Sequence, residues 1–377
     1  MKFRHFIFGI LLIATAALLA PGCRKIEPVV PGESESSETP EAQKIPLVFN
    51  AIADSTMTKA VTNKAMGSAY DTNESFAVYA AYSEGLFDAS GSYSNFWTQP
   101  TEQCNYNSSY NAWAPSTTYY WPRAGYLTFQ AYSPAGASSD MTKLSHSWSN
   151  GFTFTGFTVP AAYSQYDLLY TERVENCQRS NYTVTRDNGY DDDPNYPTFI
   201  YNGINLAFKH ALSLVEVQAA SALGSNATIK FYVQKIVLKN AYNKGTFTQN
   251  NADPWNVDTS EDLVDYPVLD KGSDWQVLPG AEESPASINP ALTLMVMPQT
   301  LHRSAGTTLN TSTDAYLEVT YKEGSAGTPT TIPVPLPDPW VTGKKYTYRL
   351  LFSNHIEFTA QITDWEDEIR GYHRIVI

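Results

Sequence analysis

The chain has 377 residues and a formal net charge of −13, and 42% of its residues are hydrophobic, 13% aromatic and only 17% charged. This composition allows a large buried core and excludes an intrinsically disordered chain and a coiled coil. The acidic surplus argues against nucleic acid as a partner, because neutralising phosphates requires a surplus of lysine and arginine.

The first 22 residues have the pattern of a bacterial export signal. Two basic residues precede an uncharged apolar run from residue 6 to residue 19, and small residues lead up to Cys23. The run is shorter than the roughly 20 apolar residues of a membrane-spanning helix, which favours a cleaved signal over a transmembrane anchor. The end of the segment resembles a lipobox. We therefore predict a lipoprotein signal peptide at 1–22 and lipidation at Cys23, whose acyl chains would hold the protein at a membrane surface.

Residues 23–44 are predicted to be the lipidated N-terminus and a flexible acidic tether. Glutamate, serine and proline dominate residues 24–44, and aromatic residues are absent. Such a segment cannot bury enough apolar surface to offset the entropy lost on ordering.

From residue 45 onwards, apolar and polar residues alternate with a period of two. The clearest case, residues 356–363, places Ile356, Phe358, Ala360 and Ile362 on one face. This alternation is typical of strands with one buried face in antiparallel sheets, and no window shows a sustained helical stripe. The pattern predicts an all-β fold.

The number of strands favours two domains. About fifteen candidate strands exceed the roughly seven of one β-sandwich, so we predict an N-terminal β-sandwich at 45–225 and a C-terminal one at 226–377. The boundary is placed in a stretch of small and polar residues. A hairpin loop within a single domain remains the alternative at this point.

Catalytic and metal-binding motifs are missing from the sequence. The six histidines show no zinc spacing, and there is no nucleophile elbow, dinucleotide fingerprint or P-loop. We therefore expect no enzymatic activity, no metal site and no cofactor. The 8 tryptophans allow a carbohydrate platform, but core packing is the more common use of aromatic side chains.

Two cysteines remain once Cys23 is lipidated. Cys104 and Cys177 could form one disulfide in an oxidising compartment. Two free, buried thiols are the alternative. The sequence leaves both open, because it does not show whether the Cα atoms lie within about 7 Å.

Eight short motifs follow one another along the mature chain. They are YWP at 120–122, LTFQAYSP at 127–134, DLLY at 167–170, FKHALS at 208–213, GTFT at 245–248, LMVMPQ at 294–299, GKKYTY at 343–348 and ITDWE at 362–366. In this order they resemble the fimbrillin family, the subunits of type V pili that Gram-negative gut and oral bacteria export as lipoproteins.

The resemblance implies two tandem transthyretin-like antiparallel β-sandwich domains and a structural or adhesive role at the surface of the outer membrane, in a fimbrium. It implies assembly with other pilus subunits by protease-triggered donor-strand exchange, a form of β-strand addition. Host or bacterial receptors or glycans are further expected partners. The alternative function is a glycan-binding surface lipoprotein of the starch-utilisation type, which would share the lipobox, the tether and the sandwiches.

The resemblance also assigns a removable strand to residues 45–52 and a protease-sensitive loop to 53–69. Family members are typically cut after arginine, but this chain has no arginine between Arg24 and Arg123. Lys59 and Lys64 are therefore the expected cleavage sites, with Lys59 the first choice. The alternative is that the subunit stays uncut as an anchor or accessory protein.

The strand to be donated is expected at the C-terminus. Arg374 is followed by Ile375, Val376 and Ile377, three β-branched residues that suit insertion as a strand. Completion of the chain's own C-terminal sandwich by the same residues is the alternative.

Overall fold

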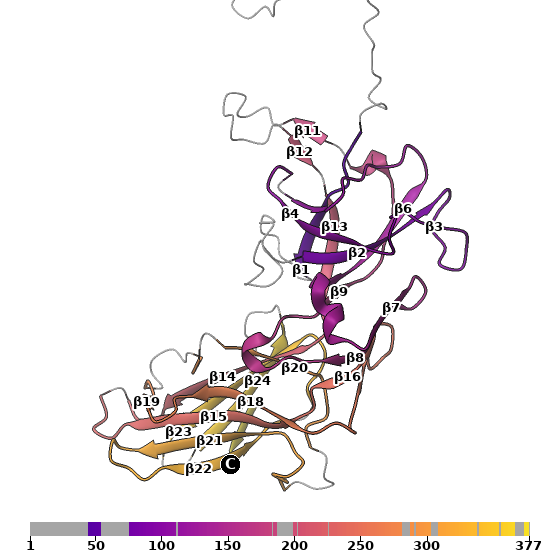
Figure 1. Ribbon diagram of the computed structural model, residues 1–377. Helices are drawn as coiled ribbons and strands as arrows, with labels where there is room; N and C mark the ends of the chain where they lie inside the picture. Colours follow the sequence, from indigo (N-terminus) through magenta and orange to yellow (C-terminus); the bar gives the residue numbers. More distant parts are fainter. Residues whose placement is uncertain are drawn as a thin grey trace, which may run out of the picture. The chain divides into compact units, whose positions relative to one another are not determined.

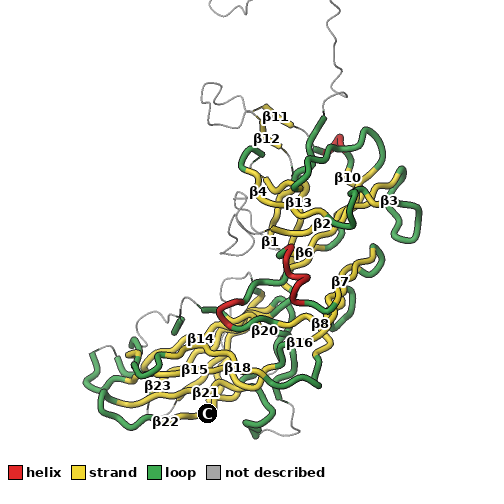
Figure 2. Tube along the Cα trace, viewed as in Figure 1, coloured by secondary structure: helices red, strands yellow, loops and turns green. Residues whose placement is uncertain are grey.

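The computed structural model describes residues 44–53, 75–110, 112–182, 184–186, 199–201, 203–224, 226–280, 287–289, 292–302, 308–337, 339–353, 356–365 and 373–376. Regular structure in this part of the chain is almost entirely strand (Figure 2), which confirms the predicted all-β fold. The helical elements described are three short 3₁₀ helices: η2 (Ala135–Asp140), η3 (Ala162–Ser164) and η4 (Arg179–Asn181). No helix among the described residues is long and apolar enough to cross a membrane.

A nine-stranded sheet holds most of the N-terminal half (Figure 1). Its strands are β1 (Phe49–Ala53), β2 (Ser75–Ser83), β3 (Ser94–Asn95), β4 (Glu102–Asn107), β5 (Ala112–Pro115), β6 (Tyr126–Ser133), β9 (Leu169–Thr171), β10 (Val174–Cys177) and β13 (Ile204–His210). The strand order is β10-β6-β9-β13-β1-β5-β4-β2-β3, and β2 also pairs with β6. This extra pairing closes the strands from β2 through β6, β9, β13, β1, β5 and β4 into a ring, which removes their open edges.

Aromatic side chains fill the interior of the ring. Phe49, Phe76, Phe129 and Phe208 come from four different strands and are fully buried, together with Trp113. They meet at the angles that aromatic quadrupoles favour, as in the T-shaped pair of Phe49 and Phe129, whose centroids are 5.3 Å apart. The alternating pattern of each strand therefore delivers one large side chain to a shared core.

Two smaller sheets are also present among the described residues. β11 (Val184–Arg186) pairs with β12 (Phe199–Tyr201). A four-stranded sheet with the order β17-β16-β8-β7 joins segments that are far apart in sequence. Its strands are β7 (Lys143–Ser147), β8 (Gly151–Thr158), β16 (Lys244–Thr248) and β17 (Trp255–Val257).

Two five-stranded sheets form the C-terminal part. One has the order β20-β14-β23-β24-β25; the other has the order β18-β15-β21-β22, with β19 paired to β15. Their bounds are β14 (Ser213–Ser221), β15 (Phe231–Ala241), β18 (Val264–Asp270), β19 (Gln276–Val277), β20 (Leu294–Val296), β21 (Tyr316–Glu323), β22 (Thr330–Pro335), β23 (Lys344–Phe352), β24 (Ile356–Asp364) and β25 (His373–Val376).

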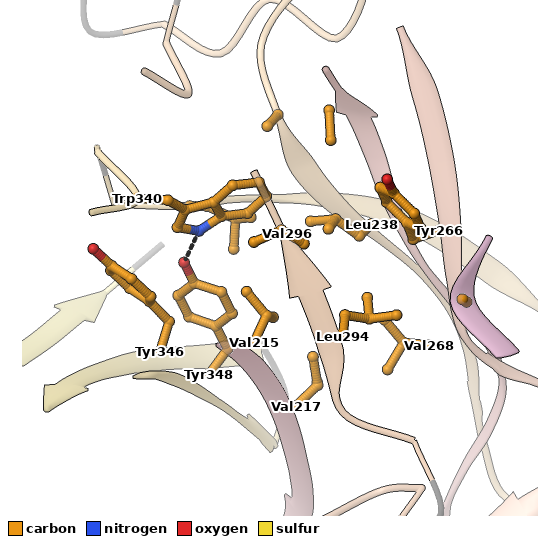
Figure 3. Close-up of a cluster of buried hydrophobic side chains, with 14 of the residues drawn as sticks. Val215, Val217, Leu238, Tyr266, Val268, Leu294, Val296, Trp340, Tyr346 and Tyr348 are labelled. Carbon is orange, nitrogen blue, oxygen red and sulfur yellow. Dashed lines mark hydrogen bonds between the residues drawn. The ribbon is translucent and has the colours of Figure 1, made fainter. Parts of the chain in front are cut away.

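The core between these sheets draws side chains from both of them (Figure 3). Val215 and Val217 of β14 pack in the same cluster as Leu238 of β15, and the Trp340 indole donates a hydrogen bond to the Tyr348 hydroxyl at 2.8 Å. The sheets therefore form a sandwich with a buried, hydrogen-bonded aromatic pair.

The strand pairing is relevant to the predicted domain boundary after residue 225. β14 pairs with β20 and with β23, in parallel with the latter from Leu214↔Lys345 to Ser221↔Phe352. A division after residue 225 would leave β14 on the N-terminal side and its partners on the C-terminal side. The proposed domains 45–225 and 226–377 remain a prediction.

Candidate functional site

Residues 45–53, which end in β1, form part of the ring and bury side chains on both faces of the segment. Leu47, Phe49 and Ala51 belong to the interior cluster, with exposed fractions of 1%, 0% and 0%. Val48 points the other way and is also buried, in a small cluster with Ala112 and Ala114. The segment is therefore enclosed on two sides, although it stands at the start of the described chain.

The backbone of this segment is paired over residues 49–53 on one edge and over residues 45–49 on the other, where Phe49 pairs with Trp113 of β5. On one side β1 runs parallel to β13, from Phe49↔Ile204 to Ala53↔Phe208, and this is the parallel ladder of the ring. On the other side the Leu47 amide donates to the Tyr119 carbonyl at 2.8 Å, and the Trp121 amide donates to the Ile45 carbonyl at 3.0 Å. We call the space that residues 45–53 occupy the β1 slot.

One tight contact in the β1 slot lies against a glycine. The Asn50 amide group donates to the Gly203 carbonyl at 3.2 Å and to the Asn205 side-chain oxygen at 3.0 Å. A Cβ atom at position 203 would lie 2.7 Å from the Asn50 side-chain oxygen, closer than such atoms approach. The slot therefore accommodates a short polar side chain at position 50, which it holds by these two hydrogen bonds.

The C-terminal strand β25 lies at a sheet edge. It pairs with β24 over four residues, from Glu357↔Val376 to Ala360↔His373, whereas β24 pairs with β23 over nine. Arg374, Ile375 and Val376 therefore take part in the chain's own sheet, and Ile377 lies outside the described residues. Donation of this strand to a second subunit stays a prediction.

The other predicted site residues are not brought together here. Cys23, Lys59 and Lys64 lie outside the described residues. Cys104 on β4 and Cys177 on β10 are both free and buried, which is the second of the two alternatives stated above. Both belong to the core cluster of the ring, and burial raises the pKa of both thiols, which disfavours the nucleophilic thiolate.

A buried polar network that the sequence does not signal joins the ring to the four-stranded sheet. Gln130 of β6 donates to the Thr171 carbonyl and to the Gln249 side-chain oxygen, both at 3.0 Å. The His146 Nε2 atom lies 2.9 Å from the Gln130 oxygen and must donate to it, because that oxygen can only accept. Gly151, at a φ of 71°, leaves room for Gln249, since a Cβ there would lie 2.4 Å from the Gln249 oxygen.

His146 is held in its neutral form in this network. Its ring stacks on Tyr79 with centroids 4.1 Å apart. Burial, with a contribution from the nearby Arg173 charge, lowers the pKa of His146 to about 4.

Three of the eight sequence motifs meet at a second, partly buried contact. The His210 Nδ1 and Asp167 Oδ2 atoms lie 2.6 Å apart, within hydrogen-bond distance, and the His210 ring stacks on Trp365 with centroids 3.8 Å apart. Burial raises the pKa of Asp167, and the His210 charge opposes that effect. The contact ties β13, the segment before β9 and the end of β24 together, which gives the motifs a structural role.

The described residues contain no group of three or more His, Cys, Asp or Glu side chains that could hold a metal ion. Two features of this part of the molecule concern strand pairing. One is the β1 slot, which residues 45–53 fill, and the other is the short edge strand β25.

Comparison with known proteins agrees with this architecture. No curated protein matches the chain. Among solved structures, it is similar to a fimbrial protein from Bacteroides vulgatus, at 14% identity and a TM-score of 0.50, over 85% of this chain and 99% of that one. It is also similar to the tip fimbrial protein Mfa3 from Porphyromonas gingivalis, at 12% identity and a TM-score of 0.36, over 86% of this chain and 100% of that one. The model of the fimbrillin-like family matches residues 58–365, so the resemblance found in the motifs is confirmed and the chain belongs to the fimbrillin-like family.

Proposed function

We propose that this protein is a subunit of a surface fimbrium that assembles by exchange of strands between subunits. In this proposal a protease cuts after Lys59 or Lys64, the segment 45–53 leaves the β1 slot, and an extended strand of another subunit takes its place. The observation that carries the proposal is the enclosure of this segment: the side chains of Leu47, Val48, Phe49 and Ala51 are buried, and the backbone is paired with β13 over residues 49–53 on one edge and over residues 45–49 on the other.

An empty β1 slot is energetically unfavourable, and this drives replacement. Burial of a large apolar side chain contributes roughly 1.5–3 kcal/mol, and both Leu47 and Phe49 would leave the core. The edges of β13 and β5 would also expose unpaired backbone groups. A strand from a neighbour restores both contributions, with main-chain hydrogen bonds supplying affinity and side chains fixing the register.

The geometry of the slot sets conditions on the incoming strand. Because β1 is parallel to β13, the replacement should also run parallel to β13. It should carry apolar side chains at three consecutive positions, in place of Leu47, Val48 and Phe49. The C-terminal run Ile375, Val376 and Ile377 has this composition.

The sequence supports placement of the subunit at the outer surface of the cell. Export through the signal peptide at 1–22 and lipidation at Cys23 would anchor the precursor in the outer membrane, and the tether at 23–44 would hold the folded part away from the lipid. The expected partners are other pilus subunits, of the same or related sequence.

Deletion of residues 372–377 is expected to abolish polymerisation and leave the fold intact. The reason is that β25 occupies an edge and pairs with β24 over four residues only, so its loss removes no central strand. The measurement treats the mature chain from residue 23 with a lysine-specific protease and looks for SDS-resistant ladders on a gel.

The intact chain should give ladders after cleavage, and the uncleaved chain serves as the control without them. The deletion variant should stay monomeric with an unchanged circular dichroism spectrum. Ladders from the folded deletion variant would contradict donation of the C-terminal strand.

A further inference from the structure

Proline residues lie in both edge strands of the sheet β18-β15-β21-β22. β22 carries Pro333 and Pro335, and β18 carries Pro267. Edge strands expose unpaired N–H and C=O groups, which a strand of another molecule can use for pairing. The two edges of this sheet therefore carry the residue type that removes such a donor.

Without its prolines, β22 would readily pair with a strand of another molecule. Its other four residues are threonine, threonine, isoleucine and valine, all β-branched and uncharged. A short segment with high β-propensity, low charge and no proline is the typical sequence for intermolecular strand pairing. Pro333 is exposed, so this edge is accessible from solvent.

The spacing of the two prolines of β22 fits the outward side of the strand. The ladder to β21 is continuous from Tyr321↔Thr330 to Tyr316↔Pro335. Residues two apart in an antiparallel strand direct their backbone groups to the same side. Because proline cannot donate to the ladder, Pro333 and Pro335 fit the positions whose nitrogen points away from β21, where each removes one outward donor.

The β18 edge is interrupted in three ways. Besides Pro267, its ladder to β15 shifts register twice, once between Ile236 and Val237 and once between Leu238 and Ala241. Two aspartates also lie on this strand and form ion pairs with lysines of β15: Asp265 with Lys239, and Asp270 with Lys235. Register irregularities and charges are the devices, besides proline, that protect sheet edges from pairing.

We propose that Pro267, Pro333 and Pro335 prevent a second copy of this chain from adding its strands to the sheet β18-β15-β21-β22. Copies that are concentrated at a surface or in a fibre then do not join side by side. Pairing between copies is left to other parts of the molecule. This inference goes beyond the proposed function and does not depend on strand exchange, because it concerns the intact, uncleaved chain.

The test restores the missing donors on one edge. The double variant Pro333→Thr/Pro335→Thr supplies two outward N–H groups and completes a β-branched strand. We expect its weight-average mass in solution, measured by light scattering after size-exclusion chromatography, to rise at least about twofold over the wild-type monomer, by strand pairing between two sheets. The opposite edge is tested separately with Pro267→Thr.

Two matched controls separate edge protection from other effects of proline. Pro333→Lys/Pro335→Lys also restores the donors but adds charges that protect an edge, and it should stay monomeric. Pro100→Thr changes an exposed proline outside the strands and should also stay monomeric. Folding of each variant is checked by circular dichroism. If the folded threonine variants of both edges were monomeric at the concentrations used for the wild type, the proposal would be wrong.

Discussion

Replacement of Phe49 by alanine is expected to lower the free energy of unfolding by about 3–5 kcal/mol, the usual cost of deleting a buried phenylalanine side chain. Phe49 is fully buried in the ring and makes T-shaped contacts with Phe76 and Phe129, whose centroids lie 6.1 and 5.3 Å away. The cavity would be lined by aromatic side chains from several strands of the closed ring, which limits its collapse.

Urea unfolding followed by tryptophan fluorescence measures this effect, because Trp113 and Trp121 lie in the same cluster. Leu86→Ala is the matched control, since Leu86 is 72% exposed and its truncation should change stability by no more than about 0.5 kcal/mol. A loss below about 1 kcal/mol for Phe49→Ala would mean that β1 is not an integral part of the ring.

Acidification is expected to weaken the fold through His146. In the unfolded chain this imidazole has its ordinary pKa of 6.5, whereas in the folded state burial lowers that pKa to about 4. Between these values the unfolded state binds more protons, so stability is fully present above pH 6.5 and falls as the pH drops towards 4. The difference between the two pKa values corresponds to about 3 kcal/mol.

The variant His146→Gln isolates this contribution. Its amide group can donate to the Gln130 oxygen as the imidazole does, but it does not titrate. Other groups titrate in the same range, so the quantity to compare is the loss of stability from pH 7 to pH 4 in the wild type and in the variant. The wild type should lose about 3 kcal/mol more. Equal losses would show that His146 is not buried in its neutral form.

The fold class could be predicted because alternation is a local property of the sequence. The pattern at 356–363 corresponds to β24, in which Ile356, Phe358 and Ala360 are buried as expected. Ile362 follows the same pattern but is 43% exposed, and it lies beyond the last described pair of β24 with β25. Alternation assigns a residue to a face, but it does not show how far the neighbouring strands cover that face.

The closed ring and the β1 slot could not be read from the sequence. β1 pairs with β13, about 155 residues later, and a parallel pairing over such a distance leaves no local signal. The burial of Val48 on the opposite face from Phe49 is equally unsignalled, because a short apolar run fits several environments. Gln130 and Gln249 gave no indication of a network, because glutamine is usually exposed and becomes a core group only through its partners.

The structure explains why some of the motifs that resemble the fimbrillin family contain the residues they do. DLLY, FKHALS and ITDWE contribute Asp167, His210 and Trp365 to one partly buried contact. Their spacing in the sequence does not reveal this, since the contact forms only when three separate segments meet. The predicted cleavage sites, Lys59 and Lys64, lie outside the described residues.

The central claim, that segment 45–53 is exchanged for a strand of another subunit, is tested most directly by mass spectrometry of the chain recovered from SDS-resistant surface fibres. The account predicts subunits that begin at Ala60 or Ala65, directly after Lys59 or Lys64, with no peptide from residues 23–53. Fibres whose subunits retain peptides from Cys23 through Phe49 would contradict it.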